Sequence, residues 1–157
     1  MPPMFGEHAH PDETVIHAQG SSGHLRAVDC RVDGVGARAF LDSGAEVSVG
    51  NPALYEELSR RGAVYSARPP VALTGVTGGT VLGRVVDVSR IALPGVDFGD
   101  TALVIADLQI FGLWGLADKP ALFVGMDSLR RFAKVTIDYG RKEYRLEFAS
   151  LEIARLG

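Results

Sequence analysis

The stretch Phe40-Leu41-Asp42-Ser43-Gly44-Ala45 decides how the rest of the chain is interpreted. It places a carboxylate at the end of an apolar strand pattern, followed by a small hydroxyl residue, a glycine and an alanine. Taken alone, Asp-Ser-Gly is also a common turn sequence, because Asp and Ser side chains bond to the nearby backbone and Gly tolerates positive φ. The surrounding sequence therefore has to separate the two interpretations.

Period-two patterns next to this stretch predict strands. Apolar and charged residues alternate over 24–32, Asp33-Gly34 marks a tight turn, and the alternation resumes over 35–41, which is typical of a β-hairpin. After the stretch, Asn51-Pro52 is typical of a helix start and Gly62 of a helix end. We therefore expect a hairpin before Asp42 and a short amphipathic helix after it.

The remaining chain consists mainly of short apolar runs bounded by Gly, Pro or Asp, which we interpret as strands. They lie at 71–73, 81–93, 101–107, 121–124, 135–137 and 144–148. A bend is expected near Ser89, where the apolar residues change face, and Asp127 is interpreted as the cap of a second short helix. About seven or eight strands and two short helices predict a mainly β fold, a closed or sandwiched antiparallel domain.

A glycine-rich stretch, Gly75-Val76-Thr77-Gly78-Gly79, lies between two of these strands. It superficially resembles a phosphate-binding loop. However, it lacks the lysine of such loops, and the strand pattern at 81–88 stands where a helix would be required. We therefore predict a hairpin tip of the kind that closes over a bound chain, and no nucleotide site.

Composition and charge narrow the classes of function. The 157-residue chain has a net charge of −3, which argues against broad electrostatic binding to nucleic acid or to an anionic membrane. It has no run of about 18 apolar residues, and its first residues lack the basic and apolar regions of a signal peptide. We therefore expect a soluble protein without a membrane span, cytoplasmic as given or periplasmic where a leader has been removed.

The ends of the chain are expected to lie outside the folded domain. Pro and Gly are frequent near the N-terminus, so residues 1–22 are predicted as a loose arm, 23–150 as the domain and 151–157 as a C-terminal tail. The single cysteine, Cys30, is interpreted as a buried apolar side chain of a strand.

Three elements in this order resemble the retropepsin-like aspartic proteases, the family of the retroviral proteases, and in particular its single-domain bacterial branch. They are Asp42-Ser43-Gly44-Ala45, the glycine-rich hairpin, and Phe123-Val124-Gly125 ahead of a short helix. The resemblance implies the closed antiparallel β barrel of an acid-protease half and peptide-bond hydrolysis without metal or other cofactor. Asp42 would be catalytic, Ser43, Gly44 and Ala45 its loop, and 75–79 a substrate-binding flap. Ser43 replaces the commoner threonine, and a helix expected at 52–61 stands between the loop and the flap, where the retroviral forms are shorter.

Hydrolysis by this mechanism needs two carboxylates about 3 Å apart that share one proton. The other aspartates fit turns or caps, among them Asp127 and Asp138. The second carboxylate is therefore expected from Asp42 of a second copy, which makes a twofold homodimer with the active site on its axis and a peptide or protein as substrate. The N-terminal arm and the segment after Phe148 are candidates for interface strands.

Two other functions stay open. The chain can be a non-catalytic peptide-binding or dimerisation module that keeps the fold. Asp42 counts against this, because such a module has no need for a carboxylate at an apolar interface. The chain can also be one half of a two-lobed aspartic protease, with the partner aspartate on the missing lobe.

Overall fold

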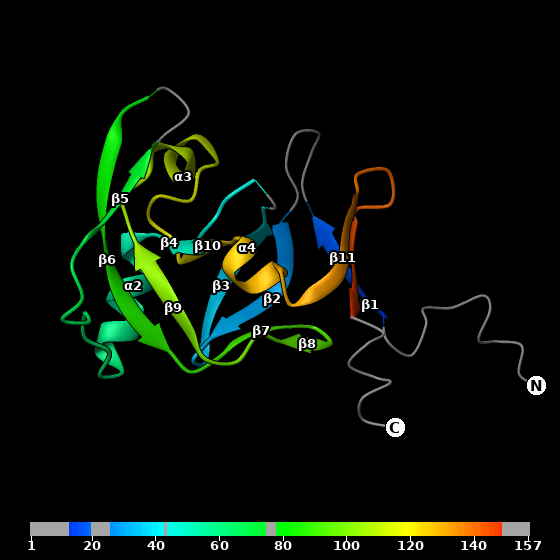
Figure 1. Cartoon of the computed structure of the whole chain (residues 1–157), viewed down its shortest axis with the longest axis horizontal. Helices are drawn as coiled ribbons and strands as arrows, with labels where there is room; N and C mark the ends of the chain where they lie inside the picture. Colours follow the sequence, from blue (N-terminus) through cyan, green and yellow to red (C-terminus); the bar gives the residue numbers. More distant parts are fainter. Residues whose placement is uncertain (1–12, 20–25, 43, 75–77, 149–157) are drawn as a thin grey trace, which may run out of the picture.

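The computed structural model describes residues 13–19, 26–42, 44–74 and 78–148. The strands are β1 (Glu13–Gln19), β2 (Arg26–Val32), β3 (Val35–Leu41), β4 (Val49–Gly50), β5 (Val71–Thr74), β6 (Thr80–Val88), β7 (Ile91–Leu93), β8 (Val96–Asp97), β9 (Thr101–Ile105), β10 (Ala121–Val124), β11 (Phe132–Asp138) and β12 (Glu143–Phe148). The helices of this part are α2 (Pro52–Arg60), α3 (Gln109–Leu113) and α4 (Met126–Leu129). Figure 1 shows the β5–β6 hairpin and α3 at one end of the molecule, and β1 and β11 at the other.

The hairpin expected before Asp42 is confirmed. Strands β2 and β3 pair antiparallel, with Val32 opposite Val35. Asp33 (φ 47°) and Gly34 (φ 86°) form the turn, and two successive positive φ angles are the requirement of a type I′ hairpin turn. Asp33 also accepts a hydrogen bond from the backbone N–H of Ser89 at 3.1 Å, so the turn is tied to the end of β6.

The strands form a mainly β fold in which the pairing order is β11-β12-β1-β2-β3-β10-β4-β9-β6-β5, with β7 and β8 attached to β2. The expected mainly β fold is confirmed, and most pairs are antiparallel, but β10 runs parallel to β3 and β4 runs parallel to β9. Long connections separate the partners in both pairs, as parallel pairing requires. In the described residues β11 and β5 are the two ends of the path, so closure of a barrel stays a prediction.

Part of the expected N-terminal arm is ordered into the sheet. Residues 13–19 form β1, which pairs with β12 and with β2, so the prediction of a loose arm is wrong there. Ile16 is fully buried opposite Tyr144, and its burial gives this strand a reason to dock. Residues 1–12 and 20–22 of the arm and the tail 151–157 lie outside the described residues.

The helix after the loop is confirmed, whereas the number of elements was underestimated. Asn51 caps α2 by accepting from the N–H of Leu54 at 3.0 Å, and Pro52 occupies its first turn. Helix α3 was not predicted, because five residues without a side-chain cap leave little pattern. Strands β4, β7 and β8 have only two or three residues, too few to show an alternation. The expected bend near Ser89 separates β6 from β7.

The central strands are buried on both faces, which gives two hydrophobic clusters. Neighbouring residues of one strand belong to different clusters, as Leu41 and Phe40 do in β3 and Val124 and Phe123 do in β10. The first cluster contains α2, Ile16 and the β12 side chains, and the second contains α3 and the inner side of the β5–β6 hairpin. The segment around Asp42 is therefore supported from two sides.

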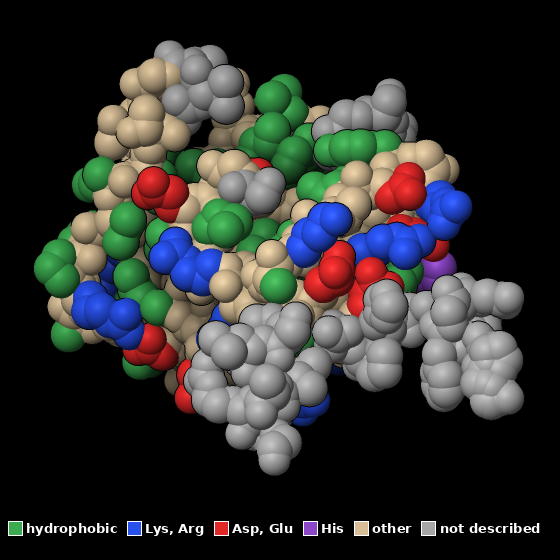
Figure 2. Space-filling model, turned by 45° about the vertical axis from the view of Figure 1, so that its right-hand side comes forward, with side chains coloured by type: hydrophobic (Ala, Val, Ile, Leu, Met, Phe, Trp, Pro, Cys, Tyr) green, Lys and Arg blue, Asp and Glu red, His purple; other side chains and the backbone are tan. Residues whose placement is uncertain are grey.

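On the face shown in Figure 2, Lys and Arg side chains are interspersed with Asp and Glu rather than gathered into a patch of one sign. This distribution agrees with the net charge of −3. None of the helices in the described ranges has the length and apolar character needed to cross a membrane.

Candidate active site

Asp42 directly follows β3, and its side chain is exposed at the end of that strand. The backbone N–H of Gly44 donates to Asp42 Oδ1 at 2.9 Å, and the N–H of Ala45 donates to the carbonyl oxygen of Asp42 at 3.2 Å. An added Cβ at Gly44 would lie 3.3 Å from the same Oδ1. The loop thus turns closely around the carboxylate and holds one of its oxygens through a main-chain donor.

The predicted segment Phe123-Val124-Gly125 lies directly beside this loop. The N–H of Asp42 donates to the carbonyl oxygen of Val124 at 2.9 Å, and Leu41 is opposite Val124 in the parallel β3–β10 pair. Gly125 is buried, and a Cβ there would lie 2.5 Å from the carbonyl oxygen of Val47 and 2.8 Å from that of Ala45. Glycine is therefore required for the close approach of the two backbones.

Asp127 does not cap α4 as its sequence position suggested. Residue Gly125 is the N-cap, and it makes no side-chain capping bond. The Asp127 carboxylate instead accepts from Ser48, through Oδ1 from the hydroxyl at 2.7 Å and through Oδ2 from the N–H at 3.0 Å. A local rule for helix starts favoured the cap, and no local signal in the sequence indicates the long-range partner Ser48.

Tyr144 contacts the end of the strand that leads to Asp42, although the sequence pattern assigned this residue only to the core. Its side chain is 1% exposed, and its hydroxyl accepts from the N–H of Leu41 at 3.4 Å. Burial raises the pKa of the Tyr144 phenol to about 12, and the nearby charge of Asp42 acts in the same direction. The phenol is therefore neutral over the whole ordinary pH range. It is close enough to Asp42 for the charge of that carboxylate to act on it.

The expected flap is a β5–β6 hairpin in which Thr74 is opposite Thr80. One face of the hairpin, with Leu73 and Val81, packs onto the cluster around Phe40, the residue two positions before Asp42. Gly78 is exposed with φ 89°, and Gly79 is exposed as well. Ser43 of the loop and Gly75, Val76 and Thr77 of the tip lie outside the described residues.

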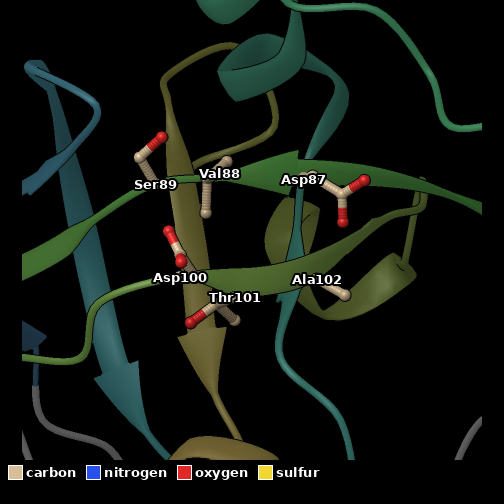
Figure 3. Close-up of a pocket in the computed structure, with 6 residues that line it drawn as sticks. All are labelled: Asp87, Val88, Ser89, Asp100, Thr101 and Ala102. Carbon is tan, nitrogen blue, oxygen red and sulfur yellow. The ribbon is translucent and has the colours of Figure 1, made fainter.

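A separate cavity of about 360 Å³ lies at the end of β6 that is remote from the hairpin tip, where Val88 pairs with Thr101 (Figure 3). Its lining includes the carboxylates of Asp87 and Asp100, and Asp87 pairs with Arg68. It contains none of the predicted site residues. In the described part of the chain, no group of three or more His, Cys, Asp or Glu side chains is placed to hold a metal ion.

Solved structures of known proteins include some with a similar fold. The protein resembles the crystal structure of a retropepsin-like aspartic protease from Rickettsia conorii with a TM-score of 0.57 and 18% identity, over 87% of this chain and 90% of that one. Two further structures give TM-scores of 0.49 at 22% identity. The retroviral protease-like domain of Ddi1 from Leishmania major is matched over 82% of this chain and 96% of its own. EIAV protease complexed with the inhibitor HBY-793 is matched over 71% and 90%.

The fold is thus that of a retropepsin-like aspartic protease, as the sequence resemblance implied. A family model described as aspartyl protease matches residues 28–128, which include Asp42, the hairpin and the Phe123-Val124-Gly125 segment. The chain belongs to this aspartyl protease family. A search of curated protein sequences gave no match.

Proposed function

We propose that the protein is an aspartic endopeptidase whose active site consists of Asp42 from two copies of the chain. The observation that supports this most directly is the exposed Asp42 carboxylate on a loop that β10 and α4 fix in place. Membership of the aspartyl protease family supports the same chemistry. Ser43, Gly44 and Ala45 form the active-site loop in this proposal.

One Asp42 carboxylate acts as the base and takes a proton from water while the water oxygen attacks the substrate carbonyl carbon. The protonated partner gives its proton to the carbonyl oxygen, which yields a gem-diol. Collapse of the diol breaks the C–N bond, with a proton passing to the leaving amine and one returning to the dyad. The chemistry uses no metal and no covalent intermediate.

A second copy is the economical source of the partner carboxylate. Asp127, the other aspartate that reaches this loop, is bound through both oxygens by Ser48 and is not available. The proposed dimer places the loops around Asp42 and Gly44 at its twofold axis. A monomer at high concentration, or a dimer joined through another surface, contradicts it.

The substrate is proposed to bind as an extended strand between the loop and the hairpin of residues 71–83, with Gly75, Val76, Thr77, Gly78 and Gly79 as the flap. Seven apolar side chains of the Asp42 loop, the hairpin and the α3 region pack onto the cluster of Phe40 while only half-buried, and we propose that they line this space. They are Ala45, Val47, Leu73, Val81, Leu108, Ile110 and Trp114. Apolar substrate side chains fit these walls.

The decisive experiment is cleavage of a mixed peptide library by wild type, Asp42→Asn and Asp87→Asn, with a pepstatin-like inhibitor and a chelator in parallel. We expect Asp42→Asn and the pepstatin-like inhibitor to abolish cleavage. Asp87→Asn is the matched control, because its exposed carboxylate lies at the remote cavity and its surface ion pair contributes little. Cleavage that survives Asp42→Asn, or that the chelator removes, overturns the aspartic mechanism. Peptide binding without any cleavage would instead identify a binding module.

A further inference from the structure

Ser48 stands at the far end of the loop that begins at Asp42, and it is completely buried. Its hydroxyl donates to Asp127 Oδ1 at 2.7 Å and accepts from the N–H of Gly125 at 3.0 Å. Its own N–H donates to Asp127 Oδ2 at 3.0 Å. One serine thus occupies both carboxylate oxygens of Asp127 and satisfies a buried main-chain donor.

Backbone hydrogen bonds complete the attachment of the loop. The N–H of Met126 donates to the carbonyl oxygen of Ala45 at 2.7 Å, and the N–H of Asp127 donates to that of Glu46 at 3.0 Å. At the other end of the loop, Asp42 is bonded to Val124 through main-chain atoms alone. The bond between Asp42 and Val124 therefore uses no side chain, whereas the far end of the loop combines two main-chain bonds with the side-chain bonds of Ser48 and Asp127.

We propose that Ser48 and Asp127 are positioning residues that set the separation of the two Asp42 carboxylates. The inference rests on the proposed dimeric active site. In a twofold dimer both loops shift by symmetry, so a displacement of one loop toward or away from the axis changes the separation of the carboxylates by twice that amount. A misplacement of about 1 Å at a reacting group is enough to lower a rate by about a hundredfold.

The separation has a signature in the pH dependence of cleavage. Two carboxylates that share a proton titrate in two steps, and the repulsion between the charges sets the interval between the steps. With an effective dielectric constant of about 20, an increase in separation from about 3 to about 4 Å shortens this interval by about one pH unit. Ser48→Ala retains Glu46, Asp127 and Tyr144 but removes a donor from Asp127, whereas Asp127→Asn removes that carboxylate. An interval that narrows in both variants therefore reports on Asp42.

The test compares wild type with Ser48→Ala, Asp127→Asn and Ser59→Ala over the full pH range. We expect Ser48→Ala to lower kcat by about tenfold to a hundredfold with KM within about threefold, and to narrow the bell-shaped profile by about one pH unit. Asp127→Asn should have an intermediate effect, since its amide oxygen still accepts from the Ser48 hydroxyl but its NH₂ faces another donor. Ser59→Ala removes only an exposed helix hydroxyl bonded to Glu56 and should behave as wild type.

A lower rate with an unchanged interval overturns the proposal, because it indicates loss of folded protein only. An unchanged rate also overturns it. If Ser48→Ala does not fold, Asp127→Asn decides by the same criteria. Titration of the Asp carboxyl carbons by NMR measures the interval without any substrate. It therefore tests the positioning role even if the wild-type protein cleaves no peptide. Absence of cleavage by wild type contradicts the proposed function and not the positioning role.

Discussion

Asp42 and Val124 are joined by a 2.9 Å hydrogen bond from the N–H of Asp42 to the carbonyl oxygen of Val124. The bond fixes the backbone of the candidate catalytic residue to a strand that follows it by about half the length of the chain. The next residue, Gly125, passes under Ala45 and Val47 so closely that no Cβ fits. The geometry of the Asp42 loop therefore depends on the β10–α4 junction as much as on its own sequence.

Gly125→Ala should destabilise the protein by about 1–3 kcal/mol, because the new methyl group meets backbone carbonyl groups of Val47 and Ala45, which cannot rotate away as a side chain could. Denaturant unfolding measures the loss. Gly36→Ala in β3 is the control, since its Cβ would have nothing within 4 Å, and it should be neutral or slightly stabilising. Equal stability of the two variants contradicts the close approach.

Asn51→Ala should lower the free energy of unfolding by about 3 kcal/mol, because it removes a helix cap and leaves buried groups without partners. The fully buried amide donates to the carbonyl oxygens of Leu116 (2.8 Å) and Lys119 (2.7 Å). Its oxygen accepts from the N–H groups of Leu54 (3.0 Å) and Ala121 (3.1 Å).

Asn51→Asp separates the two halves of this network. The carboxylate still accepts from the two N–H groups but opposes the two carbonyl oxygens, so this variant should be at least as unstable as Asn51→Ala at neutral pH. Thermal unfolding at a fixed pH measures both. A near-native melting temperature of Asn51→Asp would mean that the two donated bonds contribute nothing.

The elements that the sequence predicted are those with local signals. The β2–β3 hairpin has an alternation and an Asp33-Gly34 turn, and α2 has Asn51 as its cap. Strand β1 was missed because its few alternating residues lie among Pro and Gly. The parallel β3–β10 pair leaves no local pattern at all, since pairing over such a separation depends on the whole fold.

For the candidate site, the sequence predicted the segments but not the contacts between them. Asp127 satisfied a rule for helix starts, although its carboxylate is bound to Ser48. Tyr144 followed the alternation of a core strand, and only the tertiary structure brings its hydroxyl to the N–H of Leu41. Side-chain bonds to distant backbone atoms have no periodicity, so residue patterns cannot indicate them.

Alkaline pH should destabilise the fold through two buried neutral groups. Burial raises the pKa of the Cys30 thiol from 9.0 to about 12, and raises that of the Tyr144 phenol from 10.0 to about 12. A raised acid pKa in the folded state contributes stability that is complete below the unfolded value and is lost as the pH rises toward the folded one. The loss should therefore occur between about pH 9 and 12.

Tyr144→Phe isolates the phenol. The difference in unfolding free energy between wild type and Tyr144→Phe should shrink as the pH rises from 10 toward 12, because the variant has no phenol to ionise on unfolding. Tyr139→Phe is the matched control, since Tyr139 is 53% exposed. A difference that stays constant over this range contradicts the burial of a neutral phenol.

Substitution in the hairpin tip should separate cleavage from stability. Gly78 has φ 89° and open space around it, so Gly78→Ala strains the backbone of an exposed tip and should slow cleavage while the melting temperature changes little. Gly36→Ala in β3 has equally open space without a positive φ, lies outside the hairpin, and should retain the wild-type rate. A large fall in the melting temperature of Gly78→Ala would make the tip a structural turn and not a flap.

Mixing wild-type and Asp42→Asn chains tests whether one active site contains two copies of Asp42. If a dyad needs one carboxylate from each of two chains, a mixed dimer has only one and is inactive. At a fixed total concentration and equal proportions, the rate should then fall to about a quarter of the wild-type value, against about half if each chain carries a complete site.

The dimer itself should persist in Asp42→Asn, or tighten, because the substitution removes repulsion between two facing carboxylates. Sedimentation of each chain alone and of the mixture measures assembly beside activity. A mixture of wild type with Asp87→Asn, in place of Asp42→Asn, is the control for dilution. A rate that falls in proportion to the wild-type fraction would locate the second carboxylate within the same chain.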